Sequence, residues 1–193
     1  EEVFFFFCSK EDISVNADQI DTLTNFIPRK ILMTELNFEY REKIITFEVN
    51  LEEFIFEKTR DTRIVLISDI AGSGKTTLLK KIKSSFLQNF PTKWTSLVNL
   101  KSFLKHFCKG IGDDFRDEII KILNLNVMGE KVFYEKFKNG EVIILFDGFD
   151  EISPRCKDTV LNLFNLFYQL GTNDKNQIFI TTRSHLEVDL TKK

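Results

Sequence analysis

Uninterrupted apolar runs stand out at three places in the chain. They read RIVLIS at residues 63–68, VIILF at 142–146 and QIFIT at 177–181. Continuous runs of β-branched and aromatic residues, as opposed to alternating ones, are typical of strands that are covered on both faces. A weaker run, WTSLVNL at 94–100, is expected to join them in one sheet.

Helical periodicity occupies the segments between these runs. Apolar residues recur at helical spacing through 78–86, before a stop at Pro91. Residues 153–171 predict a longer helix, with Ser153 as its N-cap and Gly171 at its end. Strands that alternate with helices predict a parallel sheet with helices on both faces.

Two further regions have less regular patterns. Residues 101–139 predict two or three shorter helices. The breaks between them and their end are expected at Gly110, Gly112, Gly129 and Asn139. Residues 1–59 indicate only short helices, one ending at Pro28 and one over 51–59. We therefore treat 1–59 as an N-terminal helical or linker segment of unknown role.

Composition narrows the class of protein. The chain has 193 residues and a net charge of −2, with 42% hydrophobic and 29% charged residues, which suits one soluble globular domain. No bulk positive charge favours a nucleic-acid or anionic-membrane partner. The apolar stretch Val3–Cys8 is too short for a signal peptide or a membrane span, and without an initiator Met the chain is expected to be a fragment.

The three cysteines bear on the compartment. Cys8, Cys108 and Cys156 are far apart in the sequence and form no C-x-x-C motif. We expect them to be reduced packing thiols of a cytoplasmic protein, in preference to metal ligands.

The segment SDIAGSGKTT, residues 68–77, follows the first apolar run and precedes a helical pattern. It fits the phosphate-loop pattern G-x-x-x-x-G-K-[ST] at Gly74, Lys75 and Thr76, whereas Asp69 stands in place of the first glycine. Asp enters the left-handed backbone region more readily than most residues, so we expect the loop to tolerate it. Its carboxylate is then expected to point away from the phosphates.

The chemistry expected of this loop is the binding of a nucleotide with Mg²⁺. Glycines let several N–H groups converge on phosphate oxygens at a helix N-terminus. Lys75 is expected to reach the β- and γ-phosphates, and the Thr76 hydroxyl is expected to ligate Mg²⁺. The expected phosphate-binding residues are Ala71, Gly72, Ser73, Gly74, Lys75, Thr76 and Thr77.

The second apolar run ends in DGFDE, residues 147–151. Ligands of open α/β sheets bind at the carboxyl ends of the strands, so Asp147 is expected to hold Mg²⁺ through its water shell. Asp150 and Glu151 add two carboxylates, and three acids within five residues repel one another unless a cation or a bound water engages them. Asp150 is the expected water-polarising acid, with Glu151 as a close alternative that the sequence leaves open.

The third apolar run leads into Thr181, Thr182 and Arg183. Arg183 is expected to contact the γ-phosphate and so to report its presence. The alternative interpretation is a surface arginine in a turn.

With AGSGKTTLL, VIILFDGFDEIS and IFITTRS in that order, the chain resembles the NACHT family of STAND-type P-loop signalling ATPases over roughly residues 60–186. The mark of the family is a small residue after the Mg²⁺-binding Asp, here Gly148, followed by the acidic pair Asp150 and Glu151. Most other ATPases of the additional-strand group place Glu directly after that Asp.

The resemblance implies an α/β fold: a three-layer P-loop NTPase with a parallel sheet, in which the acidic strand is separated from the loop strand. It implies ATP or ADP with Mg²⁺ as ligands. Residues 60–193 are then a NACHT-type nucleotide-binding domain, incomplete at its C-terminus, where the last core strand and the lid modules are expected to be missing.

The function implied by the resemblance is a cytoplasmic switch in signalling and innate immunity. Such a domain closes on ADP, opens on exchange and self-associates, and we expect it to be a slow Mg²⁺-dependent ATPase. One alternative is a nucleotide-dependent assembly module without meaningful turnover. Another is an AAA+-type ATP-driven remodeller, which Gly148 disfavours.

Overall fold

The computed structural model describes residues 4–8, 31–37, 42–49, 53–152, 154–170 and 175–183. Within these residues the strands are β1 (Phe4–Cys8), β2 (Ile31–Asn37), β3 (Glu42–Val49), β4 (Ile64–Ser68), β5 (Trp94–Asn99), β6 (Val142–Asp147) and β7 (Gln177–Thr182). The helices are α2 (Lys75–Asn89), α3 (Leu104–Phe107), α4 (Phe115–Leu123), α5 (Val127–Lys138) and α6 (Pro154–Tyr168). Shorter helical turns are η2 (Phe54–Lys58), η3 (Leu100–Phe103) and η4 (Phe149–Glu151).

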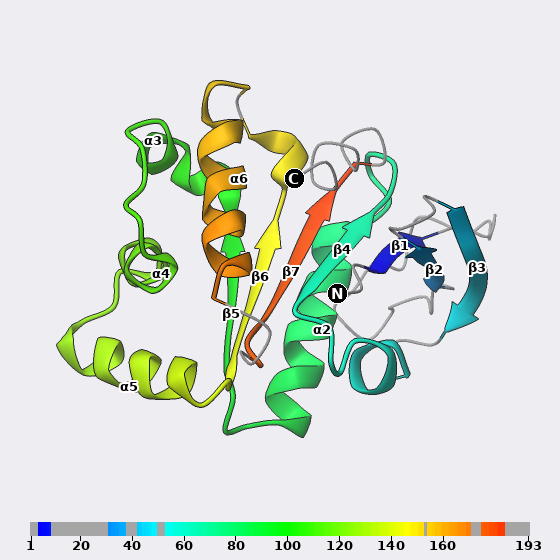
Figure 1. Ribbon diagram of the computed structural model, residues 1–193, viewed down its shortest axis with the longest axis horizontal. Coiled ribbons are helices and arrows are strands. Elements are labelled where there is room, and N and C mark those ends of the chain that lie inside the picture. Colours follow the sequence, from blue (N-terminus) through cyan, green and yellow to red (C-terminus); the bar gives the residue numbers. More distant parts are fainter. Residues whose placement is uncertain are drawn as a thin grey trace, which may run out of the picture.

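The strands form one sheet in the order β3-β2-β1-β4-β7-β6-β5. Strands β4, β7, β6 and β5 are mutually parallel, and β1 pairs in parallel with β4. The strand β2 pairs antiparallel with β1 on one side and antiparallel with β3 on the other. The arrowheads of β4, β6 and β7 therefore meet at one edge of the sheet (Figure 1). The four strands expected from the apolar runs are confirmed. The separation of the acidic strand β6 from the loop strand β4, by β7, also agrees with the expectation.

Helices cover both faces of this sheet. Along β6 the buried side chains alternate: Ile143 and Leu145 pack in one apolar cluster with α2, while Ile144 and Phe146 pack in a second cluster with α4, α5 and α6. Both faces of β6 are thus buried, which explains why its sequence is continuously apolar. The protein is an α/β structure with helices on both sides of the four parallel strands β4, β7, β6 and β5.

The region before residue 60 differs from the expectation of helix or linker. It contributes β1, β2 and β3, and the second expected helix, over 51–59, has its counterpart in the short turn η2. Residues 20–28 lie outside the described residues. The strand β1, with the sequence FFFFC, pairs with β2 on one side and with β4 on the other. From the sequence this run was considered only as a membrane or signal segment, so the strand was not predicted.

The helices between residues 101 and 139 match the prediction except at Gly129. That residue lies in the first turn of α5, and its N–H donates to the Asn126 side chain, which caps the helix (2.8 Å). The break falls instead at Asn124, whose backbone is left-handed (φ 49°). Asn accepts this conformation more readily than most residues, so it ends α4 in the way that glycine often ends a helix. The helix expected over 153–171 is α6, although the expected cap residues Ser153 and Gly171 lie outside the described residues.

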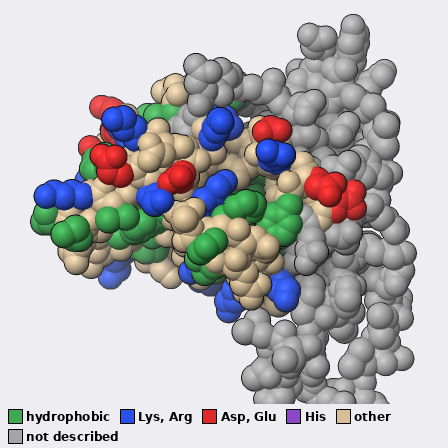
Figure 2. All heavy atoms as spheres, turned by 90° about the horizontal axis from the view of Figure 1, so that it is seen from below, with side chains coloured by type: hydrophobic (Ala, Val, Ile, Leu, Met, Phe, Trp, Pro, Cys, Tyr) green, Lys and Arg blue, Asp and Glu red, His purple; other side chains and the backbone are tan. Residues whose placement is uncertain are grey.

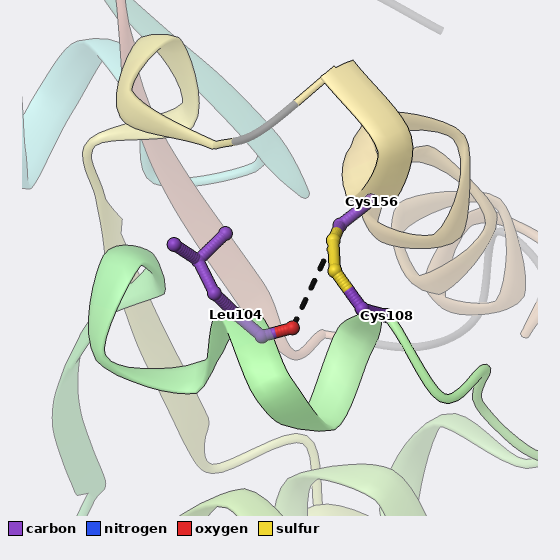
Figure 3. The surroundings of a disulfide bond; sticks show 3 residues. All are labelled: Leu104, Cys108 and Cys156. Atoms are coloured by element: carbon purple, nitrogen blue, oxygen red, sulfur yellow. Dashed lines mark hydrogen bonds between the residues drawn. A yellow bond between two sulfur atoms is a disulfide. The ribbon is translucent and has the colours of Figure 1, made fainter.

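A disulfide joins Cys108 to Cys156, with their Cα atoms 4.9 Å apart (Figure 3). The expectation of reduced packing thiols is therefore wrong for these two residues. Cys108 follows α3 and Cys156 lies in the first turn of α6, close to the Leu104 carbonyl oxygen. The packing of α3 against α6 brings together two cysteines that are 48 residues apart in the sequence, a distance that hides the pairing.

The described surface is mixed in charge. On the face shown in Figure 2, basic and acidic side chains are interspersed with apolar ones, and the face has no uniformly basic patch. No helix in the described part of the chain is long and apolar enough to cross a membrane.

The disulfide predicts a redox-dependent stability. Closing a loop of this length lowers the conformational entropy of the unfolded chain, which raises the free energy of the unfolded state by up to about 4 kcal/mol. We expect Cys108→Ser to lower the free energy of unfolding by roughly 2–4 kcal/mol in urea titrations without reductant. Cys108 is exposed, so the substitution leaves no buried cavity. Wild type in dithiothreitol should match the variant, and equal urea midpoints for the two proteins without reductant would contradict the bond.

Candidate functional site

A cleft of about 240 Å³ opens at the edge of the sheet where β4, β6 and β7 end. Three separate stretches of chain meet there: the loop before α2, the turn η4 after β6, and the residues at the end of β7. The lining residues are Ala71, Gly72, Gly74, Lys75, Thr76, Asp147, Gly148, Asp150, Glu151, Thr181 and Arg183.

The loop between β4 and α2 presents an uncapped helix start to the cleft. Gly72 and Gly74 have left-handed backbones (φ 75° and 87°), which residues other than glycine adopt only with strain. Gly74 precedes α2 and gives it no side-chain cap, and the first turn of α2 has no acidic residue. The first N–H groups of a helix have no partner within the helix and carry partial positive charge. This loop can therefore receive an anion.

Asp69, at the position of the missing glycine, is accommodated differently from the expectation. Among the described residues Asn124 is the only non-glycine with a positive φ, so the left-handed tolerance of Asp is not used. Instead the Asp69 Oδ1 atom accepts the Ile70 N–H at 2.6 Å. The side chain is buried and does not line the cleft. Its Oδ2 atom has no hydrogen-bond partner among the described residues.

Lys75, the first residue of α2, folds back over the loop. Its ammonium donates to the carbonyl oxygens of Asp69 (3.1 Å) and Ile70 (2.8 Å). These acceptors carry no net charge, so a phosphate oxygen at the same distance would add a Coulomb attraction to the ammonium that the carbonyl oxygens do not provide. An anion in the loop would therefore compete well for this ammonium.

Asp147, the last residue of β6, connects that strand to the start of α2 and to the end of β7. Its Oδ2 accepts the Thr76 hydroxyl at 2.7 Å, and its Oδ1 accepts the Thr181 hydroxyl at 2.9 Å. The Thr181 oxygen also accepts the Gly148 N–H at 2.9 Å. Because the Asp147 side chain is buried, these two hydroxyls fix the direction in which its carboxylate points.

The pair Thr76 and Asp147 fits a divalent cation. Mg²⁺ binds oxygen ligands at 2.0–2.1 Å in octahedral geometry, so neighbouring ligand oxygens lie about 3 Å apart, close to the separation of these two oxygens. Thr76 donates its proton to Asp147 and keeps its lone pairs for a cation. In the described residues no group of three or more His, Cys, Asp or Glu side chains gathers to hold a metal. A cation here would need further ligands, and Mg²⁺ commonly takes these from water and phosphate.

The acidic pair after β6 is reached through a left-handed turn at Gly148 (φ 80°). Asp150 and Glu151 each meet a cation: the Asp150 Oδ2 accepts from Arg183 Nε at 2.6 Å, and the Glu151 Oε2 lies 3.1 Å from Lys101 Nζ. The expected repulsion among the three acids is thus relieved by two basic side chains and two hydroxyls.

Most of the residues predicted from the sequence meet in this cleft. The catalytic candidates Asp150, Glu151 and Arg183 line it, as do the metal candidates Thr76 and Asp147. Of the phosphate-binding candidates, Ser73 is buried and Thr77 is exposed on α2, and neither lines the cleft.

Two residues were missed as site residues. Thr181 was noted only as a polar strand end, and its position at the end of a buried strand is the signal that could have placed it here. Lys101 follows the weaker strand β5, beside β6, where Asn99 pairs with Asp147. The signal that could have found Lys101 is its position just after the carboxyl end of a predicted parallel strand, where charged residues approach the site.

Comparisons of the chain with protein-family models, curated proteins and solved structures gave no match. Any functional assignment therefore depends on the geometry of the cleft and on the motifs that line it.

Proposed function

We propose that this chain is the nucleotide-binding core of a NACHT-type P-loop ATPase, which binds ATP and ADP with Mg²⁺ and hydrolyses ATP slowly. The observation that carries the proposal is the 2.7 Å hydrogen bond from Thr76 to Asp147. It joins the residue after the loop lysine to an acid 71 positions later in the sequence. A glycine-rich turn or an acidic turn is common by itself, whereas this contact requires both turns to meet at the same edge of the sheet.

The roles of the loop residues follow from their contacts. The N–H groups before and at the start of α2 bind phosphate oxygens, and Lys75 exchanges its two carbonyl acceptors for the β- and γ-phosphates. Thr76 and Asp147 hold Mg²⁺, which when bound neutralises charge that develops on the phosphates. Arg183 follows β7, the strand next to the loop strand β4, lines the cleft and contacts the γ-phosphate.

Slow turnover is supported by the state of the two acids. Hydrolysis needs a carboxylate to orient the attacking water and a site that excludes bulk solvent. Asp150 and Glu151 are both engaged by cations, and the Lys101–Glu151 pair is exposed to solvent. A cation beside a carboxylate favours its ionised form, so both acids are weaker bases toward water while these pairs persist.

The same observation favours a second candidate function, a nucleotide-dependent assembly module without meaningful turnover. If the two ion pairs persist when nucleotide is bound, occupancy alone would control the protein.

The wider role we propose is a cytoplasmic signalling switch, such as those of innate immunity, that self-associates through this domain. That role is supported by the resemblance to the NACHT motifs. The Cys108–Cys156 disulfide counts against the cytoplasmic part of it, because disulfides are rare in cytoplasmic proteins.

The phosphate assignment predicts that Lys75→Ala weakens ATP binding roughly 10- to 150-fold, because a charge-assisted hydrogen bond contributes about 1.5–3 kcal/mol. Titration with a fluorescent ATP analogue measures the affinity. Lys80→Ala, an exposed lysine on the same helix that does not line the cleft, is the matched control. Equal affinity of Lys75→Ala and wild type would exclude the loop as the phosphate site.

The metal assignment predicts that Mg²⁺ strengthens ATP binding to wild type and that Asp147→Asn removes most of this effect. The neutral amide keeps the shape of the side chain but loses the charge that favours the cation. Calorimetric titrations with Mg²⁺ and with EDTA provide the comparison. Binding that is indifferent both to EDTA and to the substitution is the outcome incompatible with a Thr76–Asp147 metal site.

The slow-switch mechanism predicts a rate constant for single-turnover hydrolysis well below ~10 s⁻¹. Ordinary phosphoryl-transfer enzymes such as kinases turn over at about that rate. Hydrolysis should be lost in the double variant Asp150→Asn/Glu151→Gln, because no carboxylate then remains to orient water. Rapid-quench measurements on wild type and the variant decide the matter. Turnover in the double variant at the wild-type rate would favour the assembly module or a contaminating activity.

A further inference from the structure

The two acids of η4 lie in different surroundings. The Asp150 side chain is only 6% exposed, and its Oδ2 accepts from Arg183 at 2.6 Å. The Glu151 side chain is 49% exposed, and its partner Lys101 is 63% exposed. Exposed ion pairs contribute little and open easily, whereas a buried carboxylate that loses its cation is left uncompensated. Asp150 is therefore bound to its partner, while Glu151 is free to leave Lys101.

The way in which Arg183 is held leaves most of its donors open. Asp150 takes the Nε–H, the donor nearest the backbone. The two terminal nitrogens make no hydrogen bond within the described part of the chain, and Arg183 is 44% exposed and lines the cleft. A guanidinium has five donors in a planar fork, so one anchored through Nε still presents a pair of donors to a phosphate.

This anchoring also connects neighbouring strand ends. Arg183 follows β7 and Asp150 lies in the turn after β6, so the pair bridges two adjacent strands. On the same two strands, Thr181 donates to Asp147. The arginine and the metal-binding carboxylate are thus both held by contacts between β6 and β7, and their relative positions are set by the sheet.

We propose that Asp150 is a positioning residue for Arg183, and that this pair lets the site distinguish a nucleoside triphosphate from a diphosphate. Glu151 is then the acid that orients the attacking water. If Asp150 took a proton from that water, it would lose the charge that holds Arg183 at the moment when the γ-phosphate needs the arginine. The inference rests on the proposed function, and it assigns the two acids to separate tasks.

The test compares affinities for a non-hydrolysable ATP analogue and for ADP, both with Mg²⁺. Asp150→Asn should reduce the preference for the triphosphate roughly tenfold, since a mobile guanidinium forms a weaker charge-assisted contact. Arg183→Ala should reduce the preference for the triphosphate by at least as much. The double variant Asp150→Asn/Arg183→Ala should lose no more of this preference than Arg183→Ala alone. This non-additivity is what a positioning role requires, and a general loss of stability would not produce it.

A matched control comes from a second Asp–Arg pair. At the start of α4 and outside the cleft, a terminal guanidinium nitrogen of Arg116 lies 2.6 Å from Asp114 Oδ2. Asp114→Asn keeps a good helix N-cap, so it should leave the ratio of the two affinities unchanged. Should Asp150→Asn fail to fold, Arg183→Lys replaces it, because lysine keeps the charge without the planar fork and should lose the same preference.

Single-turnover hydrolysis at saturating nucleotide separates the two acids. Glu151→Gln should abolish turnover, whereas Asp150→Asn should retain a measurable part of it. An unchanged triphosphate preference in Asp150→Asn, or additive losses in the double variant, would overturn the inference and leave the proposed function standing. If wild type binds neither nucleotide, the proposed function itself fails.

Discussion

The hydrogen bonds made by one buried carboxylate organise this site. Asp147 receives a hydroxyl from Thr76 at the start of α2 and another from Thr181 at the end of β7. A buried charge is tolerated only where polar partners compensate for the lost water, so these two threonines are a condition for placing an acid here at all. Because one threonine begins a helix and the other ends a strand, the same contacts fix the distance between the loop, the acidic turn and the end of β7.

The order of the strands makes that arrangement possible. β7 lies between β4 and β6, which places Thr181 and Arg183 between the loop and the acidic turn. Apolar side chains on both faces of β6 bury the strand, and truncation of one of its Ile, Leu or Phe side chains to Ala would cost about 2–5 kcal/mol. Core packing and site geometry thus depend on the same strand: its interior residues hold the sheet together and its last residue holds the site.

Much of this architecture was predictable from short-range sequence features. Residues 63–68 and 142–146 are continuous apolar runs because both faces of the strands are covered, and Gly74-Lys75-Thr76 marks the junction of a strand and a helix. Contacts between distant residues were not predictable in this way. The pairing of Cys108 with Cys156 depends on how α3 packs on α6, and the Arg183–Asp150 contact depends on which strands are neighbours. The strand β1 was missed because its run, FFFFC, was considered only as a membrane or signal segment, although it is of the same continuous apolar kind as the runs that predicted the other strands. In β2 and β3 polar and charged residues interrupt the apolar ones, so neither strand has such a run.

A structure of the protein with Mg²⁺ and a non-hydrolysable ATP analogue tests the central claim most directly. The account predicts that the β-phosphate lies against the N–H groups of residues 72–76, with Lys75 turned from its carbonyl acceptors to the phosphates. It also predicts Mg²⁺ beside Thr76 and Asp147, and the terminal nitrogens of Arg183 at the γ-phosphate while Asp150 keeps the Nε–H. A nucleotide bound elsewhere on the protein, or an empty cleft at saturating nucleotide, would contradict the account.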